Sequence, residues 1–372
     1  MPDNIDITSL ENTLRGDAKL LDESLDLGLS GCTIRIRSND SVLLERLAKY
    51  FAHVVSDTST PDIEILAIES EVVDSGLDFI DWAREPGKTG RKDAYFDIPE
   101  ARLVLKVRTG MLFLQSETVR IAAGPCLQYD NQVINFINSQ YMNWLQRRDW
   151  LICHASALTY QGRSFGIAGF SGGGKSTLML HLLAHAGMSY LTNDRLFIKR
   201  TPDAVLARGI PKLPRVNPGT IIHDPNLESL ISDQQRESLL TLPPEELWEL
   251  EDKYDVHVDK VYGPGRIVTE APLTAFLLLK WQRASDAPLA VTQVDLNSRQ
   301  DLLGTIMKSP GPFYQHTDGS FHQDTTAFDK KAYLSELKDV SIYEVSGGID
   351  FSQLTECWLK LLSEFGSKGK PQ

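Results

Sequence analysis

The sequence of 372 residues predicts a larger α/β domain that follows a smaller N-terminal domain, so that the whole chain is α+β. Three observations favour this fold class. From about residue 149 onward, short apolar runs are mixed with helix-forming segments. One of these runs leads through a glycine-rich loop into a helical segment at residues 164–186. Before residue 128, strand patterns follow one another closely and are separated by turn residues.

The glycine-rich loop is the most specific motif. Residues 169–176 are GFSGGGKS, which matches the phosphate-binding P-loop pattern G-x-x-x-x-G-K-[ST]. Glycines let successive backbone N–H groups converge on one anion, and the positive N-terminal end of the next helix faces the same point. A ligand-free glycine turn is the alternative. The motif predicts an ATP and Mg²⁺ site with Lys175 on the β- and γ-phosphates, Ser176 on Mg²⁺, and nucleotide contacts from Gly169, Ser171, Gly172, Gly173, Gly174, Lys175, Ser176 and Thr177.

Composition limits the classes of partner. The net charge is −12, which disfavours a nucleic acid or an anionic membrane as a partner. The most apolar run, residues 273–279, is too short to cross a bilayer, and the acidic N-terminus has no apolar signal core. We therefore expect a cytoplasmic protein. The four cysteines are too far apart in the sequence for a metal knuckle, so we expect buried thiols.

The pattern along the chain predicts an α+β domain over 1–128, a connecting helix over 129–148 that Asp130 caps, a catalytic domain over 149–365 and a disordered tail over 366–372. Residues 1–28 are predicted as a helical lead-in. In the catalytic domain, strands are predicted at 151–158, 164–168, 189–198, 204–208, 274–281, 289–294 and 341–345, and helices at 175–186, 225–239, 244–252, 298–307, 329–337 and 351–365.

Two polar residues on the strand patterns that flank the loop are candidates for catalysis. His154 interrupts the apolar run 151–158, where it could donate to the transferring phosphate, although a buried, hydrogen-bonded histidine is an equal alternative. Asp194 ends the run 190–194, where it could hold Mg²⁺, accept the proton of a substrate hydroxyl, or do both. A strand-end aspartate that caps a turn is the alternative for Asp194.

His154, the loop at 169–176 and the pair Asn193-Asp194 together resemble the core of HPr kinase/phosphorylase and its relatives. That family has a histidine strand, a G-x-S-G-x-G-K-S loop and an acidic pair on the next strand. The likeness covers residues 149–220, and the length and layout are similar to the HprK-related kinase B group. The loop is also similar to that of phosphoenolpyruvate carboxykinases. The resemblance implies a P-loop kinase domain of this type, a phosphate contact from His154, Asp194 as the catalytic base, and a homo-oligomer.

The chain departs from the family pattern at two places. Asn193 replaces one carboxylate of the acidic pair, and the segment 205–209 lacks the family's acid, so fewer side chains are available for Mg²⁺. The segment continues into a proline-rich loop with three cations nearby, which are Arg208, Lys212 and Arg215. These cations are candidates to clamp the γ-phosphate or an anionic acceptor. A solvated turn is the alternative.

These observations predict an ATP-dependent phosphotransferase that moves the γ-phosphate to a hydroxyl of a small molecule or of a protein serine. Asp194 would be the base, and Lys175 and His154 would stabilise charge on the transferred group. A small molecule is favoured slightly, because no peptide-docking groove is recognisable in the sequence. The alternative is a nucleotide-dependent switch or scaffold that hydrolyses ATP slowly and needs no acceptor.

Overall fold

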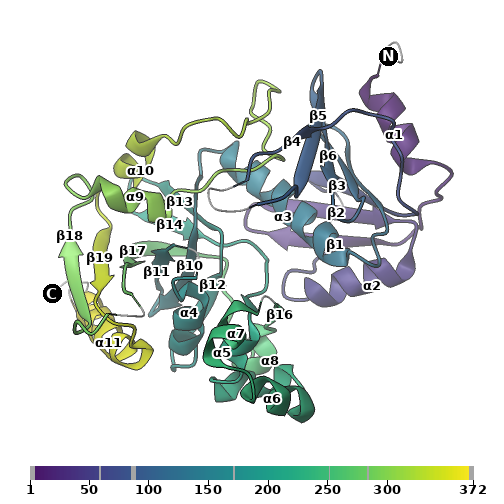
Figure 1. The fold of residues 1–372 in the computed structure, drawn as a ribbon. Coiled ribbons are helices and arrows are strands. Elements are labelled where there is room, and N and C mark those ends of the chain that lie inside the picture. The colour runs from purple at the N-terminus through teal and green to yellow at the C-terminus, as the bar shows by residue number, and fades with distance from the viewer. Residues whose placement is uncertain are drawn as a thin grey trace. The chain divides into compact units, whose positions relative to one another are not determined.

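The chain folds into two compact units (Figure 1). The computed structural model describes residues 5–57, 60–84, 89–170, 172–250, 252–282 and 285–367. The first unit consists of residues 1–149 together with 309–327, and the second of residues 150–308 and 328–372. Residues 368–372 of the predicted tail lie outside the described residues. The two units contain several sheets with helices, which agrees with the predicted mixed α/β class.

The first unit is built on an eight-stranded sheet in the order β1-β2-β3-β8-β7-β6-β5-β4. Strand β3 runs parallel to both of its neighbours, and the other pairs are antiparallel. The strands and helices are β1 (Ser24–Leu29), β2 (Cys32–Ser38), β3 (Ile63–Glu69), β4 (Ile80–Asp81), β5 (Asp93–Ile98), β6 (Ala101–Lys106), β7 (Leu112–Ser116), β8 (Arg120–Gly124), α1 (Ile7–Arg15), α2 (Ser41–Tyr50) and α3 (Asp130–Gln146).

Two predictions for this unit are wrong in detail. The helical lead-in is limited to α1, because the buried Leu25, Leu27 and Leu29 alternate with less buried residues and form β1 against β2. The predicted connecting helix, α3, belongs to the first unit and buries the apolar face that contains Phe136, whose ring lies 5.0 Å from that of Phe113. Asp130 is the first residue of α3 and not its cap, since no side chain caps this helix.

The segment 309–327 was expected in the catalytic domain, yet it packs into the first unit, where Arg102 is one of its partners. This arginine is fully buried. It forms an ion pair with Asp97 at 2.6 Å and donates hydrogen bonds to the carbonyl oxygens of Pro312 and His322 at 3.1 and 2.9 Å. Its guanidinium also lies 4.7 Å from the centre of the Phe321 ring. A buried charge needs such partners, and a distant part of the chain supplies them.

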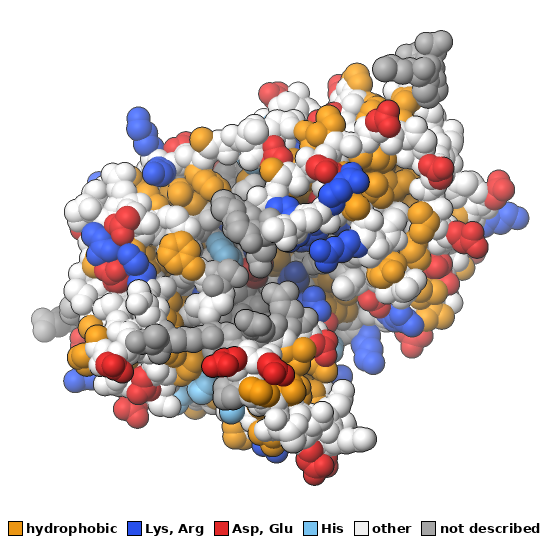
Figure 2. All heavy atoms as spheres, viewed as in Figure 1, with side chains coloured by type: hydrophobic (Ala, Val, Ile, Leu, Met, Phe, Trp, Pro, Cys, Tyr) orange, Lys and Arg blue, Asp and Glu red, His pale blue; other side chains and the backbone are white. Residues whose placement is uncertain are grey.

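Figure 2 shows acidic, basic and hydrophobic side chains interspersed over the face that it presents. Among the helices of the described segments, none combines the length and the apolar character that crossing a bilayer requires.

The second unit is built on a nine-stranded sheet. Strand β17 is its longest member: β14 pairs with the start of β17, and β11 and β19 run parallel to its later part. The remaining pairs are antiparallel. The strands are β9 (Leu151–Cys153), β10 (Ala155–Tyr160), β11 (Arg163–Gly169), β12 (Met188–Thr192), β13 (Leu196–Arg200), β14 (Val205–Arg208), β17 (Glu270–Leu279), β18 (Ala290–Val294) and β19 (Ser341–Ser346), and a separate small sheet pairs β15 (Arg215–Val216) with β16 (Tyr254–Asp255).

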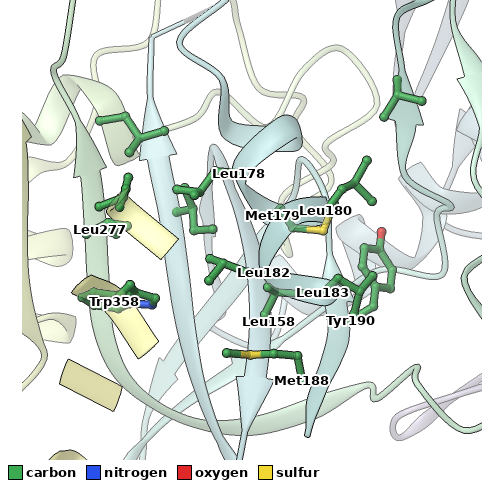
Figure 3. Close-up of a cluster of buried hydrophobic side chains, with 14 of the residues drawn as sticks. Leu158, Leu178, Met179, Leu180, Leu182, Leu183, Met188, Tyr190, Leu277 and Trp358 are labelled. Atoms are coloured by element: carbon green, nitrogen blue, oxygen red, sulfur yellow. The ribbon is translucent and has the colours of Figure 1, made fainter. Parts of the chain in front are cut away.

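Helices pack on both faces of the sheet's central strands. Neighbouring residues such as Leu277 and Leu278 point to opposite faces and enter two separate cores. The core in Figure 3 joins the sheet to α4 and α11, and Leu182 and Trp358 contribute to it. The helices are α4 (Lys175–Leu183), α5 (Pro218–Ile221), α6 (Asp233–Leu240), α7 (Pro244–Glu249), α8 (Val258–Val261), α9 (Leu303–Ile306), α10 (Lys330–Glu336) and α11 (Phe351–Ser367), with 3₁₀ turns η1 (Pro225–Leu230) and η2 (Gln300–Leu302).

Two strands that the sequence predicts as continuous are each divided in the structure. The run 151–158 is divided at His154 into β9 and β10, and the run 189–198 is divided at residues 193–195 into β12 and β13. The two halves have different partners, because β10 pairs with β12 while β9 pairs with β13. At the break, the backbone N–H of His154 donates to the carbonyl oxygen of Ile306 at 2.7 Å. His154 and Asp194 therefore both lie at breaks where the chain passes between the pair β9–β13 and the pair β10–β12.

Candidate functional site

The glycine loop lies between a strand and a helix, as the motif predicts. Strand β11 ends at Gly169 and α4 begins at Lys175. Gly172 and Gly174 have φ values of +75° and +81°, a left-handed region that favours glycine. A Cβ atom at Gly174 would also lie 2.9 Å from Cζ of Phe351. Ser171, a predicted nucleotide contact, lies outside the described residues.

Lys175 lies in the curve of this loop. Its Nζ donates to the carbonyl oxygens of Gly169 and Phe170 at 2.8 and 3.2 Å. An ammonium group held at this place can exchange carbonyl oxygens for phosphate oxygens with a small movement. Ser176 and Thr177 follow in the first turn of α4, and Oγ1 of Thr177 lies 3.2 Å from Oγ1 of Thr220.

Two aromatic residues, Trp281 and Phe351, pack beside the glycine loop, and the sequence analysis did not identify them. Nε1 of Trp281 donates to the carbonyl oxygen of Gly173 at 3.0 Å. The Phe351 ring lies edge to face with Trp281 at 5.0 Å and stacks on His181 of α4 with an interplanar angle of 7°. These residues hold the loop and the helix in fixed positions. More than a hundred residues separate Trp281 from the loop, so no local pattern identifies it.

The strand order brings the three parts of the predicted site to one edge of the sheet. Strand β10 lies between β11 and β12 and is antiparallel to both, with Ala155 opposite Ala168 and Ala157 opposite Thr192. The ends of β11 and β12 and the start of β10 therefore share an edge. Since adjacent strands are about 4.8 Å apart, the ends of β11 and β12 lie about 10 Å apart. His154, the glycine loop and Asp194 all adjoin this edge.

Asp194 is held by residues on both sides. Its Oδ1 lies 3.3 Å from Nε2 of His154, and its Oδ2 forms an ion pair with Nη1 of Arg195. The same guanidinium donates to the Asp194 carbonyl oxygen at 3.0 Å. The side chain of Asp194 remains 40% exposed, so a ligand can still approach it. Arg195 was not among the predicted site residues.

The charges around Asp194 keep it ionised. Burial alone would raise its pKa, but the positive charge of Arg195 and the hydrogen bond with His154 outweigh burial and hold the pKa well below its usual range. Lys212 adds to this effect. The pKa of Lys212 is lowered to about 8, chiefly by burial, although the charge of Asp194 opposes that change.

Asn193 has a structural role in this arrangement. The Oγ of Ser156 on β10 donates to the carbonyl oxygen of Asn193, and the same Oγ lies 3.4 Å from its Oδ1. This contact attaches the turn after β12 to β10 and fixes the start of the turn that carries Asp194.

The three predicted cations have different surroundings. Arg208 pairs with Glu270, with its Nε at 2.7 Å, and its guanidinium lies 4.3 Å from the centre of the Trp150 ring. Arg215 forms an ion pair with Asp255 at 3.2 Å. Of the three, Lys212 is the one that affects the pKa of Asp194.

Gly209 brings this loop to the site, and the sequence analysis did not single it out. A Cβ atom at this position would lie 1.9 Å from the carbonyl oxygen of Leu191. Only glycine therefore allows the loop to cross the end of β12 so closely. A glycine directly after a strand and before a proline-rich stretch was the available signal.

The described residues contain no group of three or more His, Cys, Asp or Glu side chains that could hold a metal ion by themselves. Ser176 and Asp194 remain the candidate Mg²⁺ ligands. This donor set fits Mg²⁺, which is commonly bound by one or two protein oxygens while phosphate oxygens and water complete its octahedron.

Neither the known family models nor the curated proteins provide a match to this chain. Among solved structures, it is similar to the HPr(Ser) kinase/phosphatase from Coxiella burnetii, with a TM-score of 0.30 and 11% sequence identity. That match covers 59% of this chain and 99% of the other. A likeness at this level carries no argument about function.

Proposed function

We propose that this protein is an ATP-dependent phosphotransferase that moves the γ-phosphate of ATP to a hydroxyl group. One observation supports the proposal: the edge formed by β10, β11 and β12 brings a glycine loop with the P-loop sequence to the same edge as an ionised aspartate. A carboxylate at this place can serve the Mg²⁺ of a bound nucleotide, and transfer to an alcohol in addition needs a group that orients the attacking hydroxyl.

The loop residues would hold the triphosphate. The backbone N–H groups of residues 172–174, the N-terminal end of α4 and the ammonium of Lys175 offer donors to phosphate oxygens. Ser176 and Asp194 would hold Mg²⁺. When bound, Mg²⁺ supplies positive charge that balances the phosphate oxygens.

In the transfer step, Asp194 and His154 would each have a role. The acceptor oxygen attacks the γ-phosphorus and forms a new O–P bond, the bond from this phosphorus to the β,γ-bridging oxygen breaks, and ADP leaves. The hydroxyl proton passes to the carboxylate of Asp194 and then to solvent. Because the pKa of Asp194 is low, this carboxylate acts mainly by orienting the hydroxyl and takes the proton late in the step. His154 positions the carboxylate through its contact with Oδ1.

Incubation of the purified protein with γ-labelled ATP, a library of metabolite alcohols and a protein extract tests this function. We expect label on one acceptor, and we expect Asp194→Asn to keep nucleotide binding while it loses transfer by about 100-fold or more. The exposed Asp203, on the turn before β14, provides the control variant Asp203→Asn, which should behave as wild type. ATP hydrolysis without label on any acceptor would favour the switch alternative instead.

A further inference from the structure

The turn that carries Asp194 is fixed on both sides of this residue. The hydroxyl of Thr192 donates to the carbonyl oxygen of Arg195 at 2.9 Å. The carbonyl oxygen of Asn193 accepts a hydrogen bond from the hydroxyl of Ser156 on β10. We therefore expect a ligand to change the contacts of the Asp194 carboxylate through side chains rather than through the backbone.

Both oxygens of the Asp194 carboxylate have a partner. Oδ1 lies 3.3 Å from Nε2 of His154, and Oδ2 forms an ion pair with Nη1 of Arg195. The same nitrogen donates to the Asp194 carbonyl oxygen at 3.0 Å, so the guanidinium contacts the main chain and the side chain of one residue. The side chains of Asp194 and Arg195 are 40% and 24% exposed, so a solvated ion can approach the pair. A divalent cation that approaches Asp194 meets a positive charge that is in contact with the carboxylate.

A metal ion without a nucleotide has little to offset the loss of this ion pair. Mg²⁺ binds oxygen ligands at about 2.1 Å and gives up its water molecules reluctantly. Two positive charges beside one carboxylate also repel each other. Within the part of the chain that the structure describes, no group of three or more His, Cys, Asp or Glu side chains could hold the ion by itself. The candidate ligands Ser176 and Asp194 are therefore a weak set on their own.

A bound nucleotide changes this balance. Its phosphate oxygens add ligands to the metal ion, and their negative charge reduces the repulsion between the metal ion and the guanidinium. The glycine loop and Asp194 adjoin the same edge of the sheet, so phosphates held by the loop would supply these oxygens on the side of Asp194.

We propose that Arg195 is an internal counter-ion that keeps divalent metal ions off Asp194 until a nucleotide is bound. The inference rests on the proposed function, in which Asp194 holds Mg²⁺, and it adds the order of binding: the metal ion binds with the nucleotide and not before it. In the nucleotide-free protein the guanidinium also holds the carboxylate in one orientation, so Arg195 is a positioning residue.

Titration of Mn²⁺ into the nucleotide-free protein tests this role. Mn²⁺ occupies the same octahedral oxygen sites as Mg²⁺, and free Mn²⁺ is measured by electron paramagnetic resonance. We expect Arg195→Met to bind one Mn²⁺ per chain at least about tenfold more tightly than the wild type, because the competing charge is lost. Arg195→Gln, which keeps a polar side chain, should show the same gain if Arg195→Met folds poorly. Adding Asp194→Asn to Arg195→Met should abolish the gain, which assigns the ion to Asp194.

Two control variants separate this effect from a change of charge alone. Lys331→Met removes an exposed lysine of α10 and changes the net charge by the same amount. Arg91→Met removes the arginine from an exposed ion pair with Asp81 at 2.7 Å. Both controls should bind Mn²⁺ as weakly as the wild type does. A gain in either control equal to that in Arg195→Met would overturn the inference.

Failure of this inference is distinguishable from failure of the proposed function. With a non-hydrolysable ATP analogue present, we expect the difference in Mn²⁺ affinity between the wild type and Arg195→Met to shrink. If the analogue binds but Arg195→Met without nucleotide takes up Mn²⁺ no better than the wild type, the counter-ion role is wrong and the phosphotransferase proposal stands. If the analogue does not bind, the proposed function fails, and titration of the nucleotide-free proteins still decides whether Arg195 excludes the metal ion.

Discussion

At the scale of single residues, neighbouring positive charges offset the effect of burial on the pKa of Asp194. Asp194 would be protonated more easily if burial acted alone, and the adjacent Arg195 reverses that tendency. The sequence identifies Asp194 because it ends a strand pattern after the glycine loop. The sequence does not show that the Arg195 side chain pairs with the Asp194 carboxylate. The strand pattern ends at this point, so it no longer fixes the direction of the side chains.

The lowered pKa of Asp194 makes a prediction about stability and pH. Its folded-state pKa lies below the ordinary value of 3.8, so its ionised form stabilises the fold above about pH 4, and this contribution is lost as the pH falls further. Urea unfolding of the wild type and of Asp194→Asn should give a difference in free energy of unfolding that is larger at pH 7 than at pH 3. An equal difference at both pH values would show that the charge contributes nothing.

A second residue-scale prediction concerns Gly209. A Cβ atom there would meet the backbone of Leu191, which has little room to move, so Gly209→Ala should lower the free energy of unfolding by about 3 kcal/mol. Gly304→Ala is the matched control, because a Cβ atom at Gly304 in α9 would meet no atom within 4 Å. The control should unfold at the same urea concentration as the wild type or slightly higher. Similar behaviour of both variants would contradict the close crossing of β12.

At the scale of elements, the sequence predicts well what short-range patterns determine. The strand before the glycine loop and the helix after it are both present as predicted, because β11 is a short apolar run and α4 is rich in helix formers. The sequence fails at the breaks in the runs 151–158 and 189–198, because both halves of each run have strand-like residues. Which partners each half pairs with is a property of the whole sheet.

Trp281 provides a prediction at this scale. Trp281→Phe keeps an aromatic ring beside Phe351 but removes the donor to the Gly173 carbonyl oxygen, so the loop should lose its fixed shape. We expect affinity for Mg²⁺ and a non-hydrolysable ATP analogue to fall by roughly three- to tenfold, as measured by titration calorimetry. In the described residues, the indole nitrogen of Trp358 has no hydrogen-bond partner, so Trp358→Phe is the control and should leave nucleotide affinity unchanged. Equal losses in both variants would remove the special role of Trp281.

At the scale of the whole molecule, the division into two units does not follow the order of the sequence. Residues 309–327 come after most of the second unit and fold with the first. No sequence pattern indicated this, because partners of the segment such as Arg102 and Phe113 lie two hundred or more residues earlier. The candidate site, by contrast, is formed within the second unit, from residues between 154 and 281 together with Phe351.

The variant Arg102→Lys tests whether Arg102 holds residues 309–327 in the first unit. Arg102→Lys keeps the charge but loses the paired contact with Asp97 and the donors to the carbonyl oxygens of the segment. It should lower the free energy of unfolding by about 2–4 kcal/mol and open residues 309–327 to limited proteolysis. Arg91→Lys is the control, because its pair with Asp81 is exposed and should contribute less than about 1 kcal/mol. A protected segment in Arg102→Lys would show that other contacts hold it.

The measurement that tests the central claim most directly is titration calorimetry of Mg²⁺ with a non-hydrolysable ATP analogue against the wild type, Lys175→Met and the control Lys331→Met. The account predicts one nucleotide per chain in the wild type and the control, and affinity at least about tenfold weaker in Lys175→Met, because the ammonium in the curve of the loop is lost. No binding by the wild type, or equal affinity in all three proteins, would contradict it.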